Sequence, residues 1–151
     1  MTKLTDIAIK RVECTRTRIA YRTPIKFGGR VVTDAVVVDV EMEVETRGGQ
    51  RGIGRGSMPM GNAWAWPGSL VSVEQTLTAM LAFADQMADA FRACRDVAHP
   101  LELTHALAAQ HTSVTRDIVA KQGLAEPLPR LAELVAASPL EAALYDAYGR
   151  T

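Results

Sequence analysis

The three histidines are the first residues that could do chemistry, because imidazole is both a metal ligand and a proton carrier near neutral pH. They stand at positions 99, 105 and 111. Histidines that share a metal on a helix favour a spacing of four, whereas a spacing of six turns successive rings about 240° apart. We therefore expect His99, His105 and His111 to take surface or helix-capping roles.

A run of alternate glycines suggests a phosphate-binding loop. The run is Gly52-Ile53-Gly54-Arg55-Gly56-Ser57. A P-loop continues with Lys-Ser/Thr and opens directly into a helix, and neither feature is expected here. Turn and packing glycines are therefore the favoured interpretation.

Four acidic residues alternate along one segment, and such a cluster could bind a cation. They are Asp39, Glu41, Glu43 and Glu45. Period-2 spacing places them on one face of a strand, and a solvated, charged face is the favoured interpretation.

Nucleophilic chemistry has little support in the sequence. No serine lies in a GxSxG context, and neither Cys14 nor Cys94 has a neighbouring histidine. The two cysteines form no CxxC pair, which favours free thiols in a reducing compartment. We expect this chain to contain no catalytic residue and no metal ligand.

The first third of the chain reads as strands. Residues 7–19 form the first, with a bulge or break between Ile9 and Val12, where the alternation changes phase. In the second, the inward positions are Val36, Val38, Val40, Met42 and Val44. A turn over residues 47–50 leads to a third strand, residues 51–57, whose alternate glycines leave one face bare for close packing.

The remainder reads as helices. A capping box, Ser72 with Gln75, begins a helix whose apolar face holds Leu77, Met80, Leu81, Ala84, Met87 and Phe91. Shorter helices follow at 99–110, 113–120 and 130–136, and a second capping box at Ser138 begins a last helix that ends near Gly149. The pattern predicts an α+β fold, a three-stranded antiparallel meander followed by a helical bundle. We expect Val38, Val40, Met42 and Val44 to face a helical layer that includes Leu77, Leu81 and Ala84.

Two loops are unusually apolar. Residues 22–30 join the first two strands, and residues 58–68 follow the third; both tryptophans lie in the second loop. Loops seldom expose this much apolar surface, so these either fold back onto the domain or cover a ligand or another domain.

Bulk properties exclude some functions. Lys plus Arg and Asp plus Glu are both 17, so a nucleic-acid surface, which needs a basic excess, is not expected. A net charge of zero makes self-association plausible, and a homo-oligomer is expected. No stretch resembles a signal peptide or a membrane span, which indicates a cytoplasmic protein without a membrane partner.

Three segments together resemble a known family. They are Arg22-Thr23-Pro24-Ile25-Lys26-Phe27-Gly28-Gly29 with the following valine strand, Gly49-Gln50-Arg51-Gly52-Ile53-Gly54-Arg55-Gly56 with the Trp64 loop, and the terminal stretch 138–150. The sequence resembles the N-terminal capping domain of the enolase superfamily, on the mandelate racemase and muconate lactonizing enzyme side. The resemblance covers essentially the whole chain.

The resemblance implies a division of labour. In that family a modified TIM barrel follows the cap and carries the Mg²⁺ ligands and the bases that abstract a proton α to a carboxylate. The resemblance implies a carboxylate-bearing substrate and a C-terminal barrel as partner, with no cofactor in this chain. It also implies that two cap loops close over the barrel mouth, which gives five substrate-binding candidates: Ile25, Phe27, Met60, Trp64 and Trp66.

The barrel itself is absent from the sequence. We expect residues 1–137 to form the cap and 138–151 to form a terminal helix, whose apolar stripe of Leu140, Ala143, Leu144 and Ala147 would need a barrel as partner surface. The expected function is the capping domain of a racemase, acid-sugar dehydratase or cycloisomerase. The alternative is a stand-alone binding or interaction module that kept the cap fold. Each tryptophan has its own alternative, in which it packs onto the helices of the cap.

Overall fold

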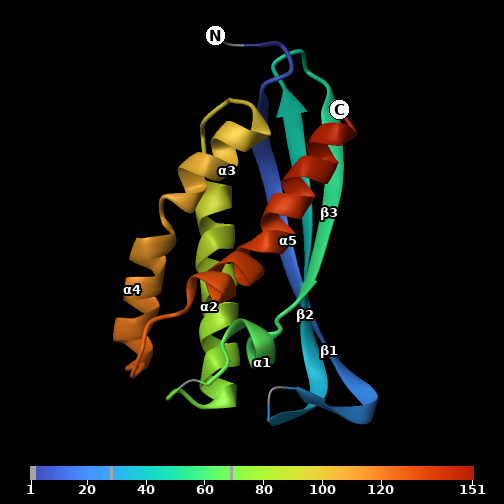
Figure 1. Ribbon diagram of the computed structural model, residues 1–151. Coiled ribbons are helices and arrows are strands. Elements are labelled where there is room, and N and C mark those ends of the chain that lie inside the picture. Colours follow the sequence, from blue (N-terminus) through green and yellow to red (C-terminus); the bar gives the residue numbers. More distant parts are fainter. Residues whose placement is uncertain (1–2, 28, 69) are drawn as a thin grey trace.

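A three-stranded antiparallel meander forms the base of the structure. The computed structural model describes residues 3–27, 29–68 and 70–151. The strands are β1 (Ile7–Phe27), β2 (Arg30–Thr46) and β3 (Arg51–Pro59), in the order β1-β2-β3. The helices are α1 (Asn62–Ala65), α2 (Val73–Ala93), α3 (Pro100–Ala108), α4 (His111–Gln122) and α5 (Arg130–Gly149), and they cover one face of the sheet (Figure 1). The predicted α+β fold is confirmed.

The alternation along β2 defines the buried face of the sheet. Val38, Val40, Met42 and Val44 are buried, whereas the residues between them are only half-buried on the opposite face. The pairing of β1 with β2 shifts register between Ile9 and Arg11, as the change of phase predicted. Burial of this apolar row accounts for the single-sided helical layer.

The alternate glycines of β3 admit a helix at very short range. A Cβ atom on Gly52, Gly54 or Gly56 would lie 2.0–2.1 Å from a backbone atom of α5. The predicted close packing is therefore confirmed, and the packing partner is the last helix of the same chain. Val40 and Met42 lie opposite Gly56 and Gly54, on the neighbouring strand β2, which also contacts α5 (Figure 1).

Helix α5 differs from its prediction at Ser138. We expected a new helix to begin there, but α5 runs without a break from Arg130 to Gly149 with Pro139 inside it. Proline lacks the N–H that would bond the carbonyl four residues earlier, which is that of Val135. The Ser138 hydroxyl donates to that same carbonyl at 2.8 Å, so the hydrogen bond lost at Pro139 is replaced.

The apolar stripe of α5 also differs from its prediction. Leu140, Ala143, Leu144 and Ala147 are all buried against the chain's own sheet and α2. The expectation that this stripe needs a barrel as its partner surface was wrong. Small alanines let the helix approach the glycines of β3, so the core closes within the described residues.

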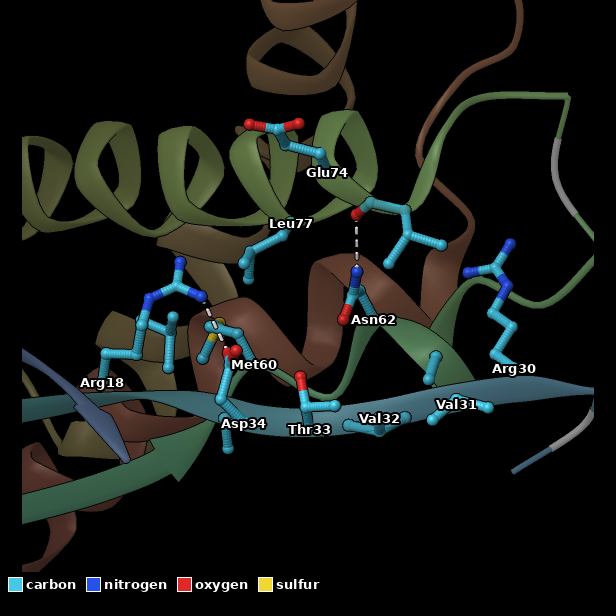
Figure 2. A pocket seen from close by; sticks show the side chains of 14 residues that line it. Arg18, Arg30, Val31, Val32, Thr33, Asp34, Met60, Asn62, Glu74 and Leu77 are labelled. Carbon is cyan, nitrogen blue, oxygen red and sulfur yellow. Dashed lines mark hydrogen bonds and ion pairs between the residues drawn. The ribbon is translucent and has the colours of Figure 1, made fainter. Parts of the chain in front are cut away.

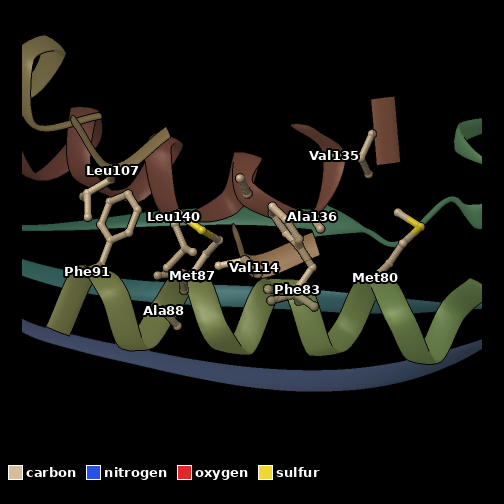
Figure 3. Packing of buried hydrophobic residues seen from close by; sticks show 14 of the residues in the cluster. Met80, Phe83, Met87, Ala88, Phe91, Leu107, Val114, Val135, Ala136 and Leu140 are labelled. Atoms are coloured by element: carbon tan, nitrogen blue, oxygen red, sulfur yellow. The ribbon is translucent and has the colours of Figure 1, made fainter. Parts of the chain in front are cut away.

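Helix α2 lies on the far side of α5 from β3. Its capping box at Ser72 and Gln75 is confirmed. Ala84 is buried as predicted, and so are Met80, Met87 and Phe91, which pack together with Phe83 (Figure 3). Leu77 and Leu81 are only half-buried at its edge. The layer that covers β2 is mainly α5, while α2 packs on β1 and α5. Leu77 and Leu81 are packed against the core that contains Val38, Val40, Met42 and Val44, but they are not fully buried in it.

Two of the histidines behave as predicted. His99 caps α3, where its Nδ1 accepts from the N–H of Leu101 at 3.3 Å, and His105 is exposed. His111 was predicted to be superficial, but its side chain is 2% exposed and lies edge-on to Phe83.

The two longest helices, α2 and α5, contribute their buried residues to this core. No helix of the described residues is long and apolar enough to cross a membrane.

Candidate functional site

Four of the five predicted substrate-binding residues line one cavity. Ile25 and Phe27 from β1 and Met60 and Trp64 from the segment after β3 surround a space of about 190 Å³. Ile25, Phe27 and Trp64 are between 38% and 52% exposed, whereas Met60 is buried at the base. Residues nearly 40 positions apart in the sequence therefore meet at one end of the meander.

The β1 side of the cavity is an offset hairpin end rather than the loop we predicted. Strand pairing continues to Phe27, which lies opposite Arg30; Gly28 lies outside the described residues. Between the pairs Ala20–Asp34 and Ile25–Val32, the four residues 21–24 stand opposite one residue of β2. Pro24 has no N–H to donate to the ladder, which accounts for the interruption. The interruption shifts the register of the last pairs, from Ile25 to Phe27, relative to the rest of the ladder.

The other side of the cavity is fixed by a single helical turn. The N–H of Met60 donates to the carbonyl of Val36 at 2.8 Å, which anchors the chain to β2 as β3 ends. At Gly61 a Cβ atom would lie 2.0 Å from Trp64 Nε1, so the indole covers a position that only glycine leaves open. Asn62 donates through Nδ2 to the carbonyl of Val73 at 2.8 Å and ties this turn to α2.

Trp66 is separated from the other four residues. Its side chain is 1% exposed, and its Nε1–H donates to Glu126 Oε1 at 2.8 Å. The indole therefore pins the segment 58–68 to the stretch that precedes α5. This placement is that of the alternative interpretation, in which a tryptophan packs onto the helices of the cap.

A second cavity of about 330 Å³ adjoins the first (Figure 2). It lies between the start of β2 and the first turns of α2, and it shares Asp34, Met60 and Asn62 with the first cavity. Arg18 Nη1 donates to Asp34 Oδ1 at 2.8 Å across its mouth. Arg30 lines the opposite end, as Figure 2 shows.

Several residues of these two cavities were missed by sequence reasoning. Asp34 and Arg30 were read only as strand and loop positions, and Tyr21 was not singled out. The three share only one feature in the sequence, a charged or aromatic side chain near an interrupted strand end. Such residues follow no fixed spacing, so no pattern identifies them. Asn62 shows a stronger signal, because an asparagine that follows a glycine after a strand often bonds to nearby backbone.

The acidic row on β2 is held by arginines. Glu41 accepts from Arg55 at 2.9 Å and from Arg11 at 2.7 Å, and these hydrogen bonds hold the pKa of its carboxyl below the usual range. Asp39 accepts from the Ser57 hydroxyl at 2.6 Å. These carboxylates form a compensated outer face, and among the described residues no group of three or more His, Cys, Asp or Glu side chains is arranged to hold a metal ion.

The remaining candidate nucleophiles are the two cysteines. Cys14 and Cys94 are free thiols, as predicted. Burial raises the pKa of Cys14, which disfavours the thiolate that would attack an electrophile. What the two cavities offer is shape, apolar surface and hydrogen-bonding groups, which suits ligand binding.

The comparisons with known proteins agree with this picture of the fold. Neither a protein-family model nor a curated protein matches the sequence. A mutant of L-talarate/galactarate dehydratase liganded with Mg and L-glucarate matches with 16% identity over 95% of this chain and 30% of that chain, at a TM-score of 0.51. The L-talarate/galactarate dehydratase of Salmonella typhimurium LT2 matches with 17% identity over 95% and 30%, at 0.46. A mandelate racemase/muconate lactonizing enzyme of Roseovarius nubinhibens ISM matches with 17% identity over 95% and 31%, at 0.41.

These matches concern the fold. The chain spans about 30% of the length of the solved structures that it matches. At 16% identity this likeness shows the fold alone, and it agrees with the predicted three-stranded meander followed by helices.

Proposed function

We propose that this chain is the substrate-capping part of an enolase-superfamily enzyme that abstracts a proton α to a carboxylate, as a racemase, acid-sugar dehydratase or cycloisomerase does. The observation that carries the proposal is the meeting of Ile25, Phe27, Met60 and Trp64 around one cavity. The resemblance in sequence independently assigns these residues to two cap segments. Trp66 is left out of the proposed substrate contacts because its side chain is buried.

In this proposal the cavity binds the substrate and excludes water from it. Three of the four side chains are partly exposed and apolar, so a substrate that covers them removes apolar area from water. Water exclusion strengthens the electrostatic stabilisation of a charged intermediate in a neighbouring catalytic domain. The cap contributes substrate choice and closure, while proton transfer belongs to residues of a barrel.

Mg²⁺ does not fit the residues described here. The acidic row of β2 is already paired with arginines and a serine, and no metal-holding group is found among the residues described. In the proposed enzyme the metal therefore belongs to the barrel, and no step of the chemistry is assigned to this chain. Homo-oligomer formation and a cytoplasmic location remain part of the proposal.

One observation favours the alternative of a stand-alone binding module. The apolar stripe of α5 is fully covered inside the chain, so the fold needs no barrel to complete its core. Such a module would use the same cavity for a ligand. The intact mass of the native protein separates the two functions, because a capping domain is expected as part of a longer chain.

The decisive experiment compares two apolar exposed side chains in a barrel-containing form of the protein. Trp64→Ala is expected to lower kcat/KM at least tenfold with an unchanged melting temperature. Ile53→Ala is the matched control, because Ile53 is 48% exposed on β3 and lines neither cavity. Equal kcat/KM in the two variants would overturn the capping role of the cavity.

A further inference from the structure

Arg30 is the one residue of the described chain with a buried polar side-chain atom that lacks a partner. Its Nη1 is shielded from solvent and makes no hydrogen bond, which holds for no other buried side-chain nitrogen or oxygen in residues 3–27, 29–68 and 70–151. A buried donor without an acceptor is costly, more so when it is charged. The guanidinium lines the second cavity, at the first position of β2.

The two acids of this cavity do not compensate Arg30. Asp34 already accepts from Arg18 at 2.8 Å. Glu74 is exposed, and its carboxylate lies on the side of α2 turned away from β2 (Figure 2). The cavity therefore presents one uncompensated positive charge, at the end opposite the Arg18–Asp34 pair.

The rest of the cavity is mainly apolar. Its lining includes the aliphatic side chains Val31, Val32, Val36 and Leu77, with Met60 at the base. A volume of about 330 Å³ is at the lower end of the range for small-molecule sites. A ligand that matches this lining has an apolar body and one anionic end.

We infer that the second cavity binds a monocarboxylate with a short apolar body, whose carboxylate accepts hydrogen bonds from the Arg30 guanidinium. The planar fork of arginine matches the two oxygens of a carboxylate. A phosphate dianion suits the site less well, because a single free cation would leave one of its two negative charges uncompensated in a largely apolar cavity. The first turns of α2 at the rim add a weak attraction for the same charge.

This inference deepens the proposed function, because the two cavities share Asp34, Met60 and Asn62 and one carboxylate-bearing substrate can reach both. It also stands on its own measurement. Anion binding at Arg30 is a property of this chain alone, whereas the capping role is read from kcat/KM at Trp64. Either can therefore fail without the other.

The test is a titration of the ¹⁵N-labelled 151-residue chain with sodium hexanoate and, separately, with hexanamide. Hexanoate is expected to produce saturable amide shifts confined to residues 31–36 and 73–77. Hexanamide has the same apolar body without the charge, and it is expected to bind at least tenfold more weakly. Arg30→Gln is expected to lose at least tenfold in hexanoate affinity with an unchanged melting temperature.

Arg47→Gln is the matched control, because Arg47 is exposed in the turn at the opposite end of β2 and the substitution removes the same charge. It is expected to bind hexanoate as the parent does. Equal affinity for hexanoate and hexanamide would overturn the inference, and this comparison needs no variant. Unchanged hexanoate binding in Arg30→Gln, equal losses in the two arginine variants, or no saturable binding would overturn it as well.

Discussion

A Cβ atom placed on Gly54 of β3 would lie 2.0 Å from the backbone nitrogen of Ala147 in α5. The helix and the strand thus approach each other through backbone, with no side chain between them. This contact fixes the height of α5 above the sheet and buries its alanines. A hydrogen bond adds to this contact near the end of α5, where Asp146 accepts from the N–H of Arg55 at 2.9 Å.

Gly54→Ala is expected to destabilise the chain by about 3 kcal/mol or more, because the new methyl group meets backbone that can retreat only if α5 shifts. The control is Gly48→Ala, where the nearest atom would be 3.6 Å away in ordinary contact. Urea unfolding followed by circular dichroism measures both. Equal unfolding midpoints for the two variants would contradict the close approach of α5.

Val40→Asp is expected to cost about 4 kcal/mol or more, because it places an unpaired charge in the core. Val40 is 2% exposed and belongs to the hydrophobic core. Val37→Asp on the half-buried outer face of the same strand makes the identical chemical change and is expected to cost far less. A thermal melt of each variant checks the assignment of faces, and the reverse order would show that the faces are exchanged.

Much of the fold was predictable because local patterns agreed with tertiary packing. The alternation along β2 identified its buried face, and the capping box at Ser72 located the start of α2. The alternate glycines of β3 predicted that another element packs closely against this strand. The prediction at Ser138 failed for a local reason. A serine followed by a proline is typical of a helix start, but it also occurs inside a continuous helix. Here the helix continues, and the Ser138 hydroxyl donates to the carbonyl of Val135, which Pro139 leaves without its usual partner.

The site was predictable only in part. Ile25, Phe27, Met60 and Trp64 were named because apolar residues in connecting segments need an explanation, and they do share a cavity. Trp64 and Trp66 differ by two positions, and no pattern separates an indole over Gly61 from one that reaches Glu126 across 60 residues of sequence. Arg30 was missed because an orphaned donor is a property of packing, not of spacing.

The buried His111 predicts a loss of stability at mildly acidic pH. Burial, followed by the neighbouring Arg130, lowers its pKa below the 6.5 of a free histidine, while Glu133 opposes the shift. The unfolded chain therefore binds the proton more readily than the folded chain. Stability is full above about pH 6.5 and falls as the pH drops from there toward the lowered pKa.

Urea midpoints at pH 7.5 and pH 5.5 measure this loss. His111→Gln is expected to reduce the difference between the two midpoints, because the titrating imidazole is gone. His105→Gln is the control, since His105 is exposed on α3. The same reduction in both variants would show that the buried imidazole is not the source.

The two tryptophans are expected to respond oppositely to phenylalanine. Trp66→Phe removes the hydrogen bond to Glu126 and part of a buried ring, which is expected to cost about 2 kcal/mol of stability. Trp64→Phe keeps an aromatic ring at a position 38% exposed and is expected to change stability by less than about 0.5 kcal/mol. Calorimetric melting measures the stability of both variants. Equal losses of stability would contradict the different environments of the two indoles.

Gly61→Ala is expected to displace the Trp64 indole without unfolding the chain. The added Cβ would lie 2.0 Å from Trp64 Nε1, but the ring is partly exposed and can swing into solvent, so the loss of stability should stay below about 1 kcal/mol. The Trp64 indole N–H resonance should shift while that of Trp66 stays in place. Gly149→Ala, where nothing lies within 4 Å, is the control.

In a barrel-containing form, Gly61→Ala should lower kcat/KM in the parent but not in a Trp64→Ala background, because the glycine acts through that ring. An equal loss in both backgrounds would show that Gly61 affects the site by another route.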